Sequence, residues 1–131
     1  LITVAIVAIL ATIALPAYNQ YRDRAKYAEV IHASEPAKTM IDVCVQTGSP
    51  AAGCQTLTAP AGIADADAVA SVVIGGALGG PYTVTVTPAP VAGYGIVAGD
   101  TYIAQGTVNA SNQTVNWVIA AGSGCLTAGY C

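Results

Sequence analysis

The sequence predicts an α+β fold in which one long N-terminal α-helix packs on a four-stranded antiparallel β-sheet. An uncharged apolar run over residues 1–15 passes into an amphipathic helical pattern that extends to about Val45. After residue 68, four short segments have the composition and alternation of strands. A length of 131 residues suits one domain, and no internal repeat or linker divides the chain.

The apolar run is typical of a retained membrane helix. As a helix, residues 1–15 rise roughly 22 Å, less than the bilayer core of about 30 Å. We therefore expect further apolar residues upstream. A signal-peptide core is often as short. Here, however, the run continues through Pro16 into a polar helical pattern, without a small-residue cleavage site.

The second half of the helix has one apolar stripe, with steps of three and four residues. The stripe predicts the face that packs on the sheet, and it contains Val30, Ala33, Ala37, Met40, Ile41 and Cys44. Pro16 and Pro36 are predicted to interrupt or kink the helix, because proline lacks the backbone donor. Gly48, Ser49 and Pro50 are predicted to end it. We divide the chain into a hydrophobic helix segment, 1–22, and a globular head, 23–131.

Four strands are predicted at residues 69–76, 82–88, 101–108 and 114–120. The second alternates strictly, which places Tyr82, Val84 and Val86 on one face. In the fourth, the shared face contains Val115, Trp117 and Ile119. The turn between the last two strands is "NASNQ". Short connections of this kind predict an antiparallel meander, one face of which packs on the helix stripe.

The four cysteines predict two disulfides and an oxidising compartment. Four cysteines allow three pairings, and closure of the shortest loops costs the least chain entropy. We therefore expect Cys44–Cys54 and Cys125–Cys131. No short CxxC pair is present and His32 is far away in sequence, so zinc is not expected.

The disulfides require the head to lie outside the cytoplasm. Arg22, Arg24 and Lys26 directly follow the apolar run, and the positive-inside rule taken alone would place them in the cytoplasm. We give the cysteines priority and expect a stronger basic signal upstream of the chain.

Composition excludes several classes of function. A net charge of −3 provides no basic footprint for nucleic acid. Charged residues make up 8% of the chain and apolar residues 54%, so the surface is expected to be covered by lipid or by other copies. A Cys125–His32 catalytic pair would need a free thiol. We therefore expect no enzyme and no cofactor.

The segment "LITVAIVAILATIALPAYNQYRDRAK" resembles the N-terminal helix of a type IV pilin of the bacterial type IVa branch. Pro16-Ala17-Tyr18 matches a family landmark, and Pro36 matches a second proline of the family's helix. The family's long helix, four-stranded sheet and C-terminal disulfide loop correspond to the whole chain. Aligned on Pro16, the chain lacks the family's first residues, which include its methylated terminus and assembly glutamate.

The resemblance implies a structural subunit that polymerises into a type IV pilus used for adhesion, twitching motility and DNA uptake. The implied partners are other copies of the chain, the inner membrane before assembly, the pilus assembly machinery, and a host surface or DNA. The implied location is the bacterial cell surface. The expected filament core consists of Leu1, Val4, Ala5, Ala8, Ala11, Ala14 and Leu15, whose small members allow close helix contact. Pro16 either stretches the helix in the filament or makes a fixed kink.

Two alternatives concern related structural proteins: a minor pilin, or a pseudopilin of type II secretion. Major pseudopilins usually have a calcium site and no C-terminal disulfide loop. Asp65, Asp67 and Asp100 are a weak calcium signal, whereas Cys125 and Cys131 favour a pilus. A third alternative is electron conduction along stacked aromatic rings, with Tyr18, Tyr21 and Tyr27 as candidates.

Overall fold

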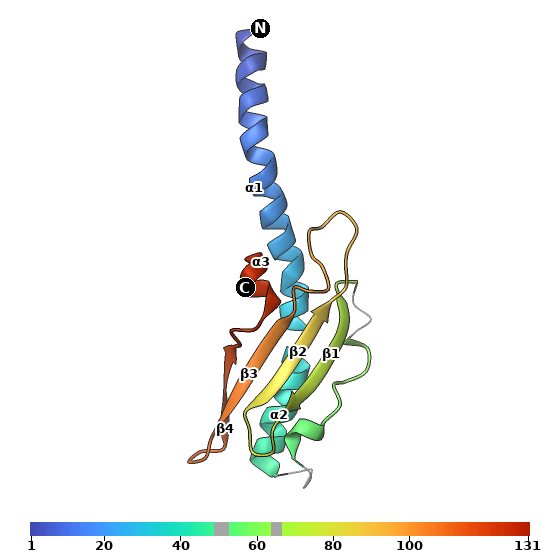
Figure 1. The fold of residues 1–131 in the computed structure, drawn as a ribbon, viewed down its shortest axis with the longest axis vertical. Helices are drawn as coiled ribbons and strands as arrows, with labels where there is room; N and C mark the ends of the chain where they lie inside the picture. Colours follow the sequence, from blue (N-terminus) through green and yellow to red (C-terminus); the bar gives the residue numbers. More distant parts are fainter. Residues whose placement is uncertain (49–52, 64–66) are drawn as a thin grey trace.

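The computed structural model describes residues 1–48, 53–63 and 67–131 and has the predicted α+β fold. A long helix extends well beyond a smaller head, in which the sheet lies against the lower half of the helix (Figure 1). The N-terminus lies at the free tip of this helix, and the C-terminus lies beside the helix where it enters the head (Figure 1).

The helical part consists of α1, Ile2–His32, and α2, Glu35–Thr47. α1 continues through Pro16, so the interruption expected there is not present in the single chain. A break does occur beside Pro36, the second proline at which the sequence predicts one: it lies at Ala33 and Ser34, and Pro36 is in the first turn of α2. Proline has no N–H to donate to the carbonyl four residues earlier, which favours a new helix start at this point.

α2 ends at Gly48, as the sequence predicts. Gly48 adopts a left-handed conformation with φ of 65°, and its N–H donates to the Cys44 carbonyl over 2.8 Å. Glycine has no Cβ and tolerates this conformation without strain. The other two expected terminators, Ser49 and Pro50, lie outside the described residues.

The sheet contains β1, Val69–Gly76, β2, Tyr82–Pro88, β3, Tyr102–Asn109, and β4, Thr114–Ile119. The spatial order β1-β2-β3-β4 is antiparallel throughout, so the predicted meander is confirmed. Two short helices were not predicted: the 3₁₀ helix η1, Cys54–Thr56, and α3, Gly124–Ala128.

The core lies between the sheet and the predicted helix stripe. Tyr82, Val84 and Val86 of β2 are buried, and so are Val30 and Ile41 of the helices.

In β4 the predicted inward face is buried only in part, because Val115 and Trp117 are half-buried while Ile119 is 42% exposed. β4 is an edge strand, and α2 reaches it at Trp117, whose indole N–H donates to Asp42 over 3.0 Å. Ile119 lies two residues beyond this contact.

Candidate functional site

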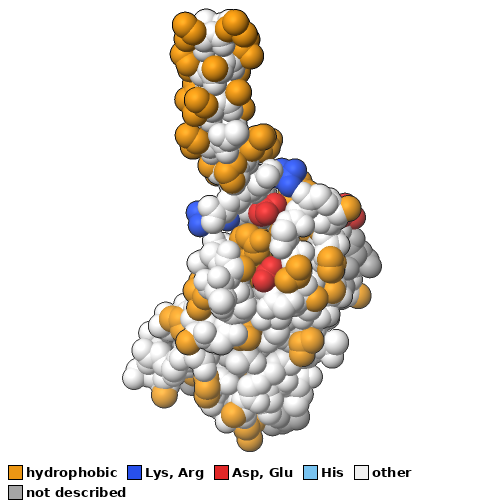
Figure 2. Space-filling view, turned by 45° about the horizontal axis from the view of Figure 1, so that its top comes forward, with side chains coloured by type: hydrophobic (Ala, Val, Ile, Leu, Met, Phe, Trp, Pro, Cys, Tyr) orange, Lys and Arg blue, Asp and Glu red, His pale blue; other side chains and the backbone are white. Residues whose placement is uncertain are grey.

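The part of α1 that lies outside the head is the first candidate site. We call residues 1–21 the stalk. Every stalk residue is exposed and none is charged. Figure 2 shows its apolar side chains around the helix, in contrast to the mixed surface of the head. All seven residues expected in a filament core lie here, and none packs against the head.

Within the described residues, α1 and α2 together form the one helical element long and apolar enough to cross a membrane, by length and composition. No residue of its most apolar window is buried inside the molecule. Ile9 is 63% exposed and Ile13 is 67% exposed, although burial of such a side chain is worth roughly 1.5–3 kcal/mol. The stalk therefore lacks a partner among the described residues of its own chain.

Directly below the stalk, α1 binds the loop between β2 and β3. The Arg22 guanidinium donates through Nη2 to the Gly93 carbonyl and lies 4.5 Å from the centre of the Tyr94 ring. Asp23 Oδ2 accepts the Gly95 N–H over 3.2 Å. A Cβ at Gly95 would lie 2.9 Å from this oxygen, so a larger residue here would displace the Asp23 carboxylate. These contacts fix the loop against the helix where the stalk begins.

The other side of α1 binds the C-terminal segment. Arg24 Nε–H donates to the Gly129 carbonyl over 2.8 Å. The Tyr27 ring stacks on Tyr130 with centroids 5.1 Å apart, and its hydroxyl donates to the Asp100 carbonyl. Burial, assisted by the nearby Asp100 carboxylate, raises the pKa of Tyr27 above its ordinary value. The phenol is therefore held in its neutral, hydrogen-bonded form.

Two disulfides with the expected pairing are present. Cys125–Cys131 closes the C-terminal loop with its Cα atoms 5.5 Å apart, and within that loop the Tyr130 N–H donates to the Cys125 carbonyl over 2.9 Å. This loop presents Tyr130 to Tyr27. Cys44–Cys54 joins α2 to η1 with its Cα atoms 5.8 Å apart. One disulfide thus links α2 to the segment before β1, and the other closes the C-terminal loop that α1 contacts.

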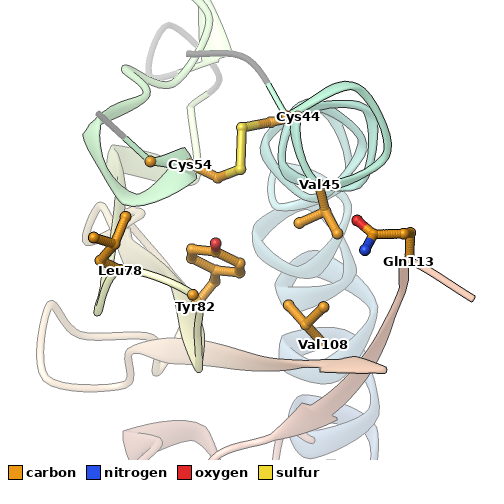
Figure 3. A pocket seen from close by; sticks show the side chains of 10 residues that line it. Cys44, Val45, Cys54, Leu78, Tyr82, Val108 and Gln113 are labelled. Atoms are coloured by element: carbon orange, nitrogen blue, oxygen red, sulfur yellow. A yellow bond between two sulfur atoms is a disulfide. The ribbon is translucent and has the colours of Figure 1, made fainter. Parts of the chain in front are cut away.

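A hollow of about 350 Å³ lies at the opposite end of the head from the stalk. Figure 3 shows the Cys44–Cys54 bridge at its edge, with Val45, Tyr82 and Val108 facing it. Gln113 and the Tyr82 hydroxyl are its only polar side-chain groups among the described lining residues, and none of these residues is charged. The Tyr82 phenol is therefore the one group with acid–base chemistry among the described lining residues, because Cys44 and Cys54 are joined in a disulfide.

The other candidate chemical groups are dispersed. His32 is exposed on α1, and Cys125 is buried in a disulfide, so the two form no catalytic pair. Among the described residues, no group of three or more histidines, cysteines and acids could hold a metal. Asp65, one of the three candidate calcium ligands, lies outside the described residues.

Sequence reasoning missed the contacts of α1 with the β2–β3 loop and with the C-terminal loop. The sequence identifies Arg22 and Arg24 only as basic residues that follow the apolar run. The position of Tyr130 next to Cys131 is the one local signal that this ring is held in place. For the conduction alternative, Tyr27 stacks on Tyr130, while Tyr18 and Tyr21 point into solvent on the stalk.

Comparisons of the chain with protein-family models, with curated proteins and with solved structures found no match. The pilin resemblance therefore rests on the residues of the N-terminal helix and on the arrangement of helix, sheet and disulfides described above.

Proposed function

We propose that this chain is the structural subunit of a type IV pilus, held by its stalk in the inner membrane and then polymerised into a filament on the cell surface. The single observation that carries the proposal is the fully exposed, uncharged stalk on a head that has its own core and two disulfides. A stalk of this kind needs an apolar environment in both states. Lipid supplies it first, and the stalks of other copies supply it in the filament.

The energetics permit this exchange, because the stalk is kept out of water in both states. The large aliphatic side chains of the stalk are 52–108% exposed and could each gain about 1.5–3 kcal/mol from full burial. They are Leu1, Ile2, Val4, Ile6, Val7, Ile9, Leu10, Ile13 and Leu15. Moving the stalk from lipid to protein keeps these groups out of water throughout, so assembly does not require their exposure.

The small residues of the stalk suit contact with several neighbours. Ala5, Ala8, Ala11 and Ala14 are three residues apart, whereas a helical turn contains 3.6 residues. The four positions therefore drift around the helix axis, and each presents a close-approach point in a different direction. In a bundle, every stalk touches more than one other stalk and therefore needs close-approach points in several directions. Local stretching at Pro16 during assembly stays a prediction.

The Cys125–Cys131 loop supports a pilus subunit over a pseudopilin, because major pseudopilins usually have no C-terminal disulfide loop. A minor pilin is the second candidate within the same class. Adhesion, twitching motility and DNA uptake are the proposed uses of the filament, with the pilus assembly machinery as the partner that builds it.

The test is a single charge in the stalk. Ala8→Asp should abolish filaments, because a charge buried in an apolar interior costs several kcal/mol and every copy in the filament would add one. The head should stay folded, since its core contains no stalk residue. Electron microscopy of cells producing Ala8→Asp decides the matter.

Two controls make this experiment decisive. Ala110→Asp places the same charge at the exposed turn between β3 and β4 and should leave filaments intact. Membrane levels of Ala8→Asp must match the unmodified chain, because the same charge opposes insertion by roughly 3 kcal/mol. Abundant filaments of ordinary diameter from Ala8→Asp cells would refute the proposal.

A further inference from the structure

The side chains along α1 change in a fixed order where the stalk meets the head. Apolar residues end at Leu15, Tyr18 and Tyr21 follow at 63% and 75% exposure, and Arg22 and Arg24 come next. We call Tyr18, Tyr21, Arg22 and Arg24 the neck. Figure 2 shows Lys and Arg side chains at the boundary between the apolar stalk and the head. Apolar, aromatic and basic side chains occur in this order where a helix leaves a bilayer.

The two arginines differ in how much hydrogen-bonding capacity they have left. Arg24 is exposed and uses only Nε, toward the Gly129 carbonyl, so among the described residues both of its Nη groups are without a partner. Arg22 is more restrained, since Nη2 binds the Gly93 carbonyl and lies 3.8 Å from Asp23. Its side chain is 37% exposed. Arg24 is therefore the neck residue best able to take an external anion.

Acids near the neck are already occupied. The Asp23 side chain is only 14% exposed: Oδ2 accepts the Gly95 N–H, and the buried Oδ1 lies 3.8 Å from Arg22 Nη2 without a hydrogen bond. Glu29 binds Lys26 over 2.8 Å, and this hydrogen bond raises the pKa of the lysine. Arg24 is consequently the neck arginine that forms no ion pair with an acid among the described residues.

We propose that Arg24, supported by Arg22, binds the phosphate of an anionic phospholipid in the leaflet that faces the head. A guanidinium matches phosphate oxygens with paired N–H donors. Tyr21 lies three residues before Arg24 and Tyr18 four before Arg22, so each ring shares a helix face with one arginine. These tyrosines sit at the depth where an aromatic ring and its hydroxyl contact lipid glycerol and head groups.

An anionic lipid fits the neck better than a zwitterionic one. A zwitterionic head group brings an ammonium, which would need an exposed carboxylate. Asp23, beside Arg22 and Arg24, is only 14% exposed, and Glu29 is paired with Lys26. The proposed lipid contact also gives a reason why Arg22 and Arg24 lie outside the cytoplasm, whereas the positive-inside rule would place them within it. Their charge is balanced by lipid at the membrane surface until the subunit is extracted for assembly. This inference rests on the membrane-inserted subunit of the proposed function.

The test measures lipid selectivity of the full chain in phosphatidylcholine vesicles that contain spin-labelled phosphatidylglycerol or spin-labelled phosphatidylcholine. The unmodified chain should retain the anionic label preferentially. Arg24→Gln should lower this preference about fivefold, the effect expected of one basic residue at a charged surface. Arg24→Lys should retain part of it. Lys38→Gln is the matched control, because Lys38 lies on α2 within the head and binds Glu35, and it should change nothing.

Equal retention of the two labels by the unmodified chain would overturn the inference, as would equal preference in Arg24→Gln and Lys38→Gln. If Arg24→Gln disturbs the head, salt provides the second measurement. In the unmodified chain, about 0.5 M salt should remove the preference for the anionic label, because salt screens surface charge. A preference that persists at this salt concentration would contradict the proposed contact. Filaments are scored separately. Normal filaments without lipid selectivity would reject this inference and leave the proposed function in place.

Discussion

Two isoleucines on the helical part of the chain have opposite environments. Ile9 is 63% exposed on the stalk, whereas Ile41 is fully buried between α2 and the sheet. The residue type and the secondary structure are the same, so the difference lies only in the availability of a partner within the chain. The head supplies a partner for the second half of the helix and none for the first.

Charge follows the same division. All four cationic residues, Arg22, Arg24, Lys26 and Lys38, lie on the helices below the stalk. The helical residues below the stalk, in α1 and α2, can therefore present one face to water and another to the sheet, but the stalk has no charged face. The comparison indicates that the two halves suit different surroundings, and it leads to four predictions.

Removal of the stalk should give the largest effect. A chain that lacks residues 1–22 should be a soluble, folded monomer that forms no filaments, because the core and both disulfides lie in the remaining chain. Light scattering and electron microscopy provide the measurement. Filaments that persist without the stalk would show that the head drives assembly.

Exchange of the two isoleucines for alanine should separate stability from assembly. Ile41→Ala should lower the free energy of unfolding of the head by about 2–5 kcal/mol, since it leaves a cavity in the core. Ile9→Ala should leave the stability of the head unchanged and reduce filament yield. Denaturant unfolding of the head and filament yield from cells are the two readouts. Equal loss of head stability in both variants would contradict the division.

The two disulfides should contribute similar amounts to the head. Sequence separations of 10 and 6 residues correspond to about 2.8 and 2.4 kcal/mol from closure entropy. Replacing Cys44 and Cys54 together by serine, or Cys125 and Cys131 together, should therefore destabilise the head by these amounts in denaturant titrations. Peptide mapping without reduction supplies the control, and a Cys44–Cys125 link would disprove the pairing.

Tyr27 should make the stability of the head depend on high pH. Burial raises its pKa in the folded state, so the folded phenol keeps its proton after the unfolded one begins to lose it. This contribution is complete below about pH 10 and falls as the pH rises further. Tyr27→Phe should cost about 1 kcal/mol at neutral pH and flatten the decline at high pH. Tyr130→Phe, at a less buried phenol with a raised pKa, should flatten it less, and an unchanged slope in Tyr27→Phe would exclude this assignment.

Several features could be predicted because they depend on local pattern. Strict alternation in β2 placed Tyr82, Val84 and Val86 inward, as the structure has them. The connections between strands fixed the order of the meander, and loop closure cost fixed the disulfide pairing. Ile119 was predicted inward by the same alternation and is exposed, because alternation assigns a face of the sheet but does not show how far the helix covers it.

The sequence by itself determined the apolar stalk, the strands and the disulfide pairs, since hydrophobic period, turn residues and short-range closure act between neighbours in the chain. Only the tertiary structure decided which side chains join distant segments. Arg22 reaches Gly93, Arg24 reaches Gly129, and Tyr27 stacks on Tyr130. These pairs are separated by 71 to 105 residues, and no local pattern encodes such contacts. They form because the sheet and the C-terminal disulfide bring two loops against the same turns of α1, where burial and hydrogen bonding then select the partners.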